Sequence, residues 1–213
     1  MNKDIYVLGI GHNTIVYIDL LEQCGYNILG LYNYADDKIG EEYFGYQIIG
    51  TYNDLYSKSD LTGMSFALSM GDNRMRKDAY DKITSKNGNI PTIVHPKADV
   101  SKYAKLGNGV IVHSNTVIHP DTIIGDNTVF SCNATMIHSS IIGNHCYIAG
   151  NALVGAYTKI LDGVLVGLNA TVVSGKVDYI GVNAIIGAGA VVSSSVESNC
   201  IVAGVPARLI KSF

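Results

Sequence analysis

Six histidines are the side chains of this 213-residue chain best suited to move a proton near neutral pH. One lies near the N-terminus and the other five fall in a central stretch: His12, His95, His113, His119, His138 and His145. A general base needs a ring that reaches solvent and a neighbour that fixes its tautomer. The fold of the central stretch decides which of these rings can meet both conditions.

The stretch from Val94 to Val192 repeats every six residues. Counting in sixes from Val94 gives fourteen apolar positions in a row, and after a slip of two residues beyond Val172 the frame resumes at Ile180. A small residue usually stands two places before each apolar position, and Asn or Gly usually stands three places after it. A period of six fits neither a helix nor an alternating strand, and it indicates a hexapeptide β-solenoid with left-handed turn residues. Three flat faces make a coil of about eighteen residues.

This frame separates the histidines. His95 and His113 follow inward residues and are eighteen apart, so we expect them to stack on adjacent coils, and His119 has the same role at another edge. His145 falls on a left-handed turn position, which histidine tolerates. These four therefore have structural interpretations.

His138 is the exception because it stands two residues after the inward Met136, where a ring should project outward from a corner. Ser139 follows it, and its hydroxyl can hold a tautomer but adds no negative charge. His138, with Ser139 beside it, is therefore the histidine best placed to meet a substrate, and an ordinary exposed histidine is the alternative interpretation.

The first 90 residues have a different pattern. Residues 5–8 read as a buried strand, 9–14 as a glycine-containing turn, 15–21 as a helix and 27–32 as a second strand. In such a βαβ unit the turn at the helix N-terminus can receive a phosphate. A dinucleotide fingerprint is incomplete, because Thr14 replaces the third glycine and Asn33 stands where an acid would bind a ribose. A turn without any ligand is the alternative.

Further short elements are expected at 46–49, 53–57 and 65–69, followed by a helix through about 86 that Asp72 or Asn73 caps. The change from this charged helix to hexads places a domain boundary near residue 90.

Bulk properties exclude several classes. The formal net charge of −3 argues against nucleic acid as a partner. The four cysteines show no metal-type spacing, and no apolar run approaches the ~18 residues of a membrane span. Because of this cysteine spacing we expect no bound metal. No secretory signal is recognisable, so we expect a cytoplasmic protein.

Two C-terminal segments carry a family resemblance. Residues 186–192 (Ile-Gly-Ala-Gly-Ala-Val-Val) and 204–208 (Gly-Val-Pro-Ala-Arg) resemble the signature of acetyl-CoA-dependent hexapeptide acyltransferases. With the βαβ unit before it, the chain resembles the nucleotide-amino-sugar N-acetyltransferases and the related sialic acid O-acetyltransferases. The resemblance implies an α/β N-terminal Rossmann-like domain (1–90) followed by a left-handed parallel β-helix (91–213).

The resemblance also implies site residues. Residues 133–143 resemble the family stretch that carries the catalytic histidine, which implies His138 as the general base. In the family an acid commonly follows this histidine, whereas here Ser139 does. Residues expected at the nucleotide-linked sugar are Gly9, Gly11, His12, Asn13, Asn33, Asn73 and Arg76. Residues expected at acetyl-CoA are Tyr147, Ala149, Gly150, Gly167, Gly187, Ala188, Arg208 and Lys211. The family is trimeric, with sites between subunits.

The implied function is N-acetylation of a nucleotide-linked amino sugar, expected to be a 4-amino-4,6-dideoxyhexose of cell-surface glycans such as lipopolysaccharide. Three alternatives remain: a sugar O-acetyltransferase of the sialic acid type, a metal-dependent solenoid resembling γ-type carbonic anhydrases, and a non-catalytic scaffold.

Overall fold

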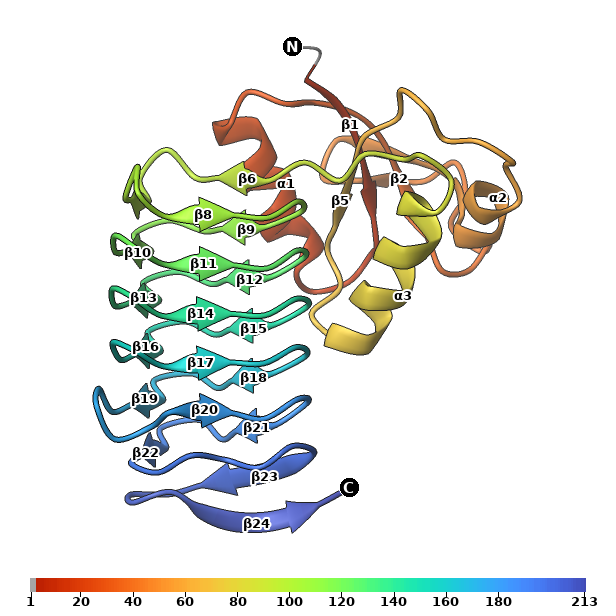
Figure 1. Ribbon diagram of the computed structural model, residues 1–213. Helices are drawn as coiled ribbons and strands as arrows, with labels where there is room; N and C mark the ends of the chain where they lie inside the picture. Colours follow the sequence, from red (N-terminus) through yellow and green to blue (C-terminus); the bar gives the residue numbers. More distant parts are fainter. Residues whose placement is uncertain (1–2) are drawn as a thin grey trace. The chain divides into compact units, whose positions relative to one another are not determined.

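A computed structural model describes residues 3–213, which form two compact units. The first ends at Ile93 and the second runs from Val94 to Phe213. Each unit is described by itself below. Figure 1 labels their helices and strands.

The first unit is built on a five-stranded sheet in the order β3-β4-β2-β1-β5. Its elements are β1 (Asp4–Leu8), α1 (Thr14–Gln23), β2 (Asn27–Asn33), β3 (Glu42–Tyr43), β4 (Tyr46–Thr51), α2 (Tyr52–Tyr56), β5 (Phe66–Leu68) and α3 (Asn73–Thr84). The strands are parallel except for β3, which forms a hairpin with β4 that the sequence pattern did not predict. The predicted βαβ unit is therefore confirmed.

Local capping fixes where two of these helices begin. The Asp72 carboxylate accepts hydrogen bonds from the backbone N–H groups of Arg74 and Met75, so Asp72 is the N-cap of α3. Thr51 and Asp54 form a reciprocal capping box at the start of α2. Both helices start directly after strands or turns at the same edge of the sheet, which is where ligands bind to parallel sheets.

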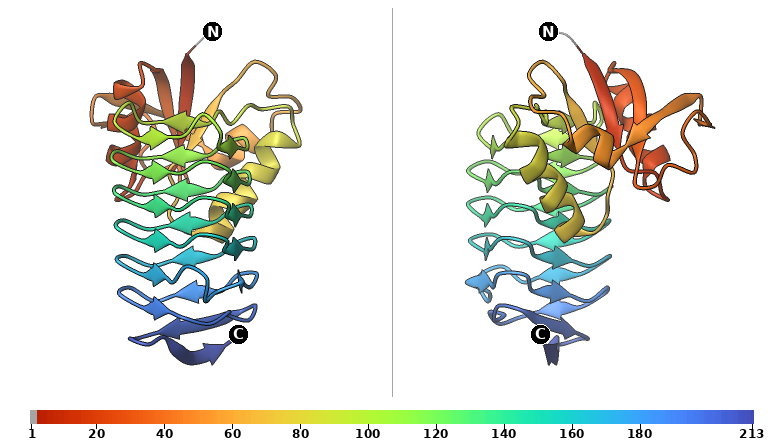
Figure 2. Two further views of the ribbon diagram at one scale, coloured as in Figure 1. Left: turned by 60° about the vertical axis from the view of Figure 1, so that its left-hand side comes forward. Right: turned by 90° about the vertical axis from the view of Figure 1, so that its right-hand side faces the viewer.

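The second unit is a left-handed parallel β-solenoid arranged in three flat faces (Figures 1 and 2). Its strands have two residues each except for the last two, β23 and β24, which are longer and pair antiparallel. Face 1 holds β7 (Asp99–Val100), β10 (Val117–Ile118), β13 (Thr135–Met136), β16 (Leu153–Val154), β19 (Thr171–Val172) and β22 (Val191–Val192). Face 2 holds β8 (Lys105–Leu106), β11 (Ile123–Ile124), β14 (Ile141–Ile142), β17 (Lys159–Ile160) and β20 (Tyr179–Ile180). Face 3 holds β6 (Ile93–Val94), β9 (Ile111–Val112), β12 (Val129–Phe130), β15 (Tyr147–Ile148), β18 (Leu165–Val166), β21 (Ile185–Ile186), β23 (Cys200–Ala203) and β24 (Arg208–Ser212).

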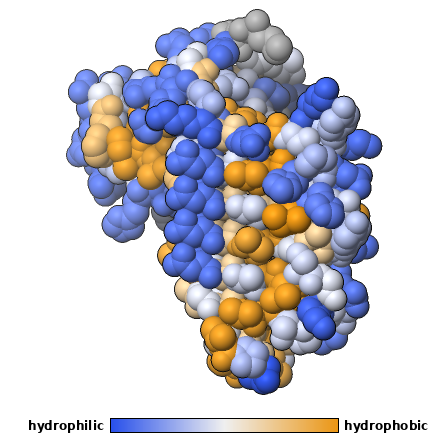
Figure 3. All heavy atoms as spheres, turned by 90° about the vertical axis from the view of Figure 1, so that its left-hand side faces the viewer, coloured by the Kyte–Doolittle hydropathy of each residue, from blue (hydrophilic) through white to orange (hydrophobic). Residues whose placement is uncertain are grey.

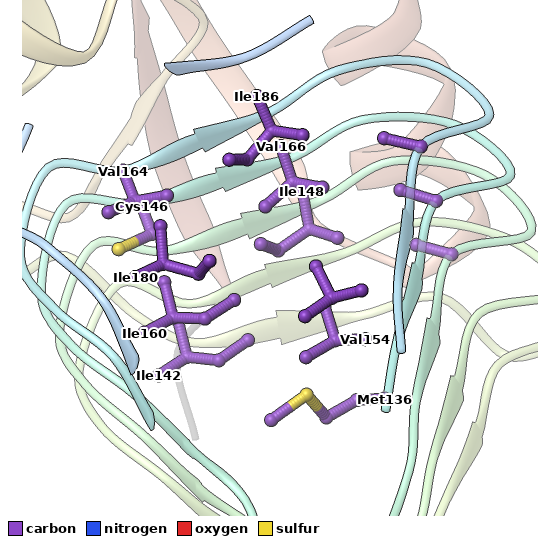
Figure 4. Packing of buried hydrophobic residues seen from close by; sticks show 14 of the residues in the cluster. Met136, Ile142, Cys146, Ile148, Val154, Ile160, Val164, Val166, Ile180 and Ile186 are labelled. Atoms are coloured by element: carbon purple, nitrogen blue, oxygen red, sulfur yellow. The ribbon is translucent and has the colours of Figure 1, made fainter. Parts of the chain in front are cut away.

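Strand pairing confirms the eighteen-residue coil. Ile118 pairs with Met136, and Met136 pairs with Val154, so each residue lies beside the one eighteen places later. The second residue of each short strand points inward and joins one continuous apolar core (Figure 4). At the predicted slip the interval becomes twenty, because Lys159 pairs with Tyr179, and the buried Val177 fills the interior there.

The turns have the predicted backbone. The Asn and Gly residues expected in left-handed conformation all have positive φ, among them Asn115, Asn133 and Gly163. Between coils there is little space: a Cβ on Gly125 would lie 2.6 Å from the Gly143 carbonyl carbon. In the described chain, no helix is both long and apolar enough to cross a membrane.

Candidate functional site

The corner between faces 1 and 2 presents His138 to solvent. It lies in residues 137–140, which connect β13 to β14, and the preceding Met136 is buried as predicted. The corner is held to the next coil by the buried Ser140, whose hydroxyl donates to the Gly155 carbonyl and accepts from the Thr158 N–H, both at 3.0 Å. The His138 side chain therefore projects from a fixed segment of backbone.

A hydrogen-bond chain starts at this histidine and crosses to the preceding coil. His138 Nδ1 lies 3.3 Å from Ser139 Oγ, and Ser139 Oγ donates to Asp121 Oδ2 at 2.9 Å. A hydroxyl carries one proton, so when Ser139 donates to Asp121 its oxygen must accept from His138 Nδ1–H. In the neutral ring, that assignment makes Nε2 the nitrogen that can accept a proton. The carboxylate that the sequence lacks directly after His138 is thus present eighteen residues before Ser139.

Tyr157 completes the corner from the following coil. Its ring meets the His138 ring edge-on, with centroids 5.3 Å apart and planes at 88°. Asp121, Ser139 and Tyr157 occupy the same left-handed turn position, with φ of 58°, 56° and 61°. Positive φ is regular at this turn position of the solenoid, but it is rare for a residue as bulky as tyrosine. Sequence reasoning missed both Asp121 and Tyr157, although the eighteen-residue register would have found them.

The other solenoid histidines have structural surroundings. His95 and His113 are buried at the corner between faces 3 and 1, and His95 N–H donates to Val112 O of the next coil. Burial, aided by the neighbouring His95, lowers the pKa of His113 to about 4, so this ring is neutral at pH 7. His145 has φ of 58° and contacts the Asn127 side chain at 2.9 Å. The sorting of His95, His113 and His145 by hexad position is confirmed.

The glycine turn of the first unit is shaped by close packing. Gly9 has φ of 117°, and a Cβ there would lie 2.5 Å from Ser69 Oγ, so a side chain does not fit. Thr14 stands in place of the third glycine; its buried hydroxyl accepts from Gly11 N–H at 2.8 Å and lies 3.1 Å from Gly9 O. Asn13 lies against Gly71, so the turn and the start of α3 adjoin. Gly9, Gly11, His12, Asn13 and Asn73 are thus gathered at one edge of the sheet.

Two predicted contact residues turn out to be buried. Arg76, expected to contact the substrate, is 1% exposed, and its guanidinium donates to Met70 O and to Asn73 Oδ1. Asn33 is also buried and donates to Ala35 O. The free energy of burying a cation is offset here by these hydrogen bonds, so Arg76 supports the turn from behind instead of facing a ligand.

A cavity of about 410 Å³ lies within the first unit beside these residues. It is lined by Tyr34, Tyr52, Asn53, Tyr56, Met70, Met75, Asp78, Ala79 and Lys82. Burial raises the pKa of Tyr52 to about 12, so its hydroxyl stays protonated, and the Tyr34 ring meets it edge-on at 6.0 Å. The volume and aromatic lining suit a planar ligand. The sequence pattern gave no indication of this cavity.

The residues expected at acetyl-CoA follow one edge of the solenoid. We call Ala149, Gly150, Gly167, Gly187 and Ala188 the glycine edge; they lie in the turns from face 3 to face 1. Tyr147 projects from face 3, and the exposed Arg208 and Lys211 lie in β24 at the end of the same face.

Backbone packing explains part of this composition. A Cβ on Gly167 would lie 2.7 Å from Ala188 N, and one on Gly187 would lie 2.8 Å from the Ala203 Cβ, so close coil stacking already requires glycine there. Ala149 N–H and Asn151 N–H donate to neighbouring coils. The backbone N–H of Gly150 lies between these two engaged groups.

The histidine corner and the glycine edge do not meet within one chain. His138 lies in a turn that leaves face 1, whereas Gly150 lies in a turn that enters it. The two therefore bound opposite sides of the same flat face.

Family comparisons agree with this architecture. Residues 4–83 match the PglD N-terminal domain, and residues 103–138 and 121–156 match the bacterial transferase hexapeptide (six repeats). The chain is a hexapeptide-repeat transferase. Across residues 3–213, no group of three or more His, Cys, Asp or Glu side chains is arranged to hold a metal ion.

Solved structures of this transferase fold extend over nearly the whole chain. The acetyltransferase domain of PglB from Neisseria gonorrhoeae has a TM-score of 0.89 at 24% identity, with 98% of this chain and 100% of that chain covered. A histidine-to-asparagine variant of perosamine N-acetyltransferase from Caulobacter crescentus, in complex with CoA and GDP-perosamine, has a TM-score of 0.87 at 24% identity, covering 98% and 97%. WeeI from Acinetobacter baumannii has a TM-score of 0.86 at 21% identity, covering 97% and 100%. These likenesses confirm the predicted fold.

Proposed function

We propose that this transferase moves an acetyl group from acetyl-CoA to the amine of a nucleotide-linked amino sugar, with His138 as general base. The observation that carries the proposal is the exposed His138 ring, whose Nδ1 lies 3.3 Å from Ser139 Oγ, so that Nε2 is the nitrogen left to accept a proton. Structural neighbours with the same fold include an N-acetyltransferase in complex with CoA and a GDP-linked amino sugar.

The proposed mechanism assigns each proton. The sugar amine attacks the thioester carbonyl carbon, and His138 Nε2 accepts the proton that the attacking nitrogen loses. The Gly150 N–H, placed between two amides that are already bonded, would donate to the carbonyl oxygen as negative charge develops there. The carbon–sulfur bond then breaks, and the proton held by His138 is available to the departing thiolate.

We assign the nucleotide part of the acceptor to the first unit. Its phosphates would meet the backbone N–H groups of His12 and Asn13 at the N-terminus of α1, in the turn that Gly9 and Gly11 shape. The N–H groups of these two glycines already donate within the first unit. Its base would enter the cavity that Tyr34 and Tyr52 line, because aromatic side chains stack on planar rings.

We assign acetyl-CoA to the glycine edge. The small side chains there would allow the pantetheine arm of CoA to approach the backbone of the turns closely. Arg208 and Lys211 are exposed at the end of the same face and could pair with CoA phosphates.

This assignment requires more than one copy of the chain, and we propose a homotrimer. His138 and Gly150 lie on opposite sides of face 1, so a base from one subunit must meet the acyl donor on another. Exposed apolar side chains on the flat faces, including Ile123, Ile141 and Leu153, are consistent with contact between copies. Figure 3 shows hydrophobic and hydrophilic side chains running in columns along one side of the solenoid.

Mass spectrometry tests the proposed reaction. Purified protein would be incubated with acetyl-CoA and a panel of UDP-, dTDP- and GDP-linked amino sugars, beside matched sugars that carry a hydroxyl in place of the amine and free sialic acid. We expect one amine-bearing sugar to gain one acetyl group. Acetylation of only the hydroxyl compounds would favour the O-acetyltransferase alternative, and no acetylated product from any compound would reject both.

A further inference from the structure

The corner of His138 contains an acidic residue that the adjacent sequence does not reveal. We propose that Asp121, acting through the hydroxyl of Ser139, is the positioning residue that orients His138 and stabilises its protonated form. This inference rests on the proposed function. It assigns a role to a carboxylate from the preceding coil, at a place where the residue after the histidine carries no charge.

The direction of the hydrogen bonds supports this role. Asp121 accepts from Ser139 Oγ, and Ser139 Oγ is left to accept from His138 Nδ1–H. Nδ1 keeps its proton whether the ring is neutral or charged, so the chain need not rearrange when Nε2 gains a proton. The negative charge at the far end favours the imidazolium that forms during amine attack.

Asp121 is not part of the ladders that satisfy the solenoid backbone. At the corner between faces 2 and 3, side chains of Asp126, Asn144 and Asp162 each accept a backbone N–H of the coil before. The Asp121 carboxylate instead accepts a side-chain hydroxyl of the coil after, and its residue is exposed. The contact between Asp121 and Ser139 therefore satisfies no backbone group and connects only to the corner that holds His138.

The same register also allows the charge to be moved. Asp121 and Ser139 share a left-handed turn conformation, and Asp tolerates it at position 121. The double substitution Asp121→Asn with Ser139→Asp therefore keeps the net charge and the backbone while placing the carboxylate directly after His138.

Steady-state kinetics across pH test the proposal. We expect Asp121→Asn and Ser139→Ala each to lower kcat about tenfold with KM little changed, because an exposed charge acting through a hydroxyl is partly screened. The double variant Asp121→Asn with Ser139→Ala should be no worse than either single one. The acidic limb of the pH–rate profile should move to lower pH in all three. The charge-moving exchange should recover most of kcat, and Asp178→Asn, an exposed carboxylate elsewhere, should match the wild type.

A second readout does not depend on turnover. In protein labelled with carbon-13 at the histidine ring, the His138 signal, assigned with a His138→Gln variant, would be titrated in the wild type and in Asp121→Asn. We expect the midpoint to move to lower pH in the variant, even if no sugar of the panel is acetylated. An unchanged midpoint, an unchanged kcat in Asp121→Asn, or an exchange variant no better than Asp121→Asn would overturn the proposal.

Discussion

The Asp121 carboxylate accepts a hydrogen bond from the Ser139 hydroxyl at 2.9 Å, although eighteen residues separate the two in the sequence. One coil of the solenoid accounts for this separation, because residues eighteen apart lie side by side on the same turn position. The surroundings of His138 are therefore supplied by three successive coils, with Asp121 before it and Tyr157 after it.

Replacing His138 tests its role as a base. We expect His138→Ala to lower kcat by about a hundredfold or more at neutral pH, the range typical of a lost general base. An amine can lose its own proton, so the residual rate should rise with pH. His119→Ala, on the same corner of the preceding coil, is the matched control and should retain its activity. Full activity in His138→Ala would remove this residue from the mechanism.

Replacing Tyr157 with asparagine should keep or raise the stability of the protein and lower its activity. Its positive φ costs about 1 kcal/mol, and Asn tolerates the same conformation, so Tyr157→Asn should unfold at the same or a higher temperature than the wild type. It should also be less active, because the ring that meets His138 edge-on is gone. Tyr157→Phe keeps the ring and should behave like the wild type in both measurements. A Tyr157→Asn variant with wild-type kcat/KM would contradict a role for the ring.

Protonation of the buried His113 should lower the free energy of unfolding in acid. The folded protein holds its pKa at about 4, below the ordinary value of 6.5, because the ring is buried. Between these values the unfolded chain binds the proton and the folded chain does not, so the free energy of unfolding falls as the pH is lowered through this window. The shift corresponds to about 3 kcal/mol by pH 4.

The measurement is urea unfolding at several pH values for the wild type and His113→Gln. The difference between the two curves isolates His113 from the other titrating groups. The Gln variant should lose less stability between pH 6.5 and 4, and parallel curves would show that protonation of His113 is not the cause.

Subunit mixing tests whether the site is shared between copies. Gly150→Pro removes the proposed donor N–H, and the turn should accept it because Pro96 and Pro120 occupy the equivalent hexad position. Homo-oligomers of Gly150→Pro and of His138→Ala should both be weakly active. After the two are unfolded together and refolded, mixed oligomers contain some intact sites, so activity should reappear.

A mixture no more active than its parents would place both groups in one chain or neither in the site. Light scattering on the wild type gives the number of copies, and a monomer would contradict the shared site directly. Wild-type protein taken through the same refolding is the control for recovery.

The solenoid could be predicted from the sequence because the residue types within each hexad indicate which positions point inward and which form the turn. Inward positions must be apolar, as at Met136, and turn positions must tolerate positive φ, as at Asn133, so the pattern specifies burial and backbone together. The β3–β4 hairpin was missed because Glu42 and Tyr43 form a two-residue strand whose pairing depends on tertiary contact instead of a repeat.

The candidate site was only partly predictable. His138 was identified because an outward corner is a property of its own hexad, whereas Asp121 and Tyr157 belong to neighbouring coils and are visible only when the sequence is read at intervals of eighteen. Arg76 was expected at the sugar from the family resemblance, but it is buried, and burial depends on tertiary packing that a likeness of residue types does not specify. The cavity around Tyr52 is lined by four separate segments, namely the residues after β2 and after β5 and the helices α2 and α3, so no local pattern predicts it.

Acetyl transfer from carbon-13-labelled acetyl-CoA, followed by NMR on a nucleotide-linked amino sugar, tests the central claim most directly. The account predicts an amide carbonyl signal that grows with time in the wild type, at a rate that falls about a hundredfold or more in His138→Ala. A label that stays on CoA in the presence of every amino sugar, or that appears only as an ester, would contradict it.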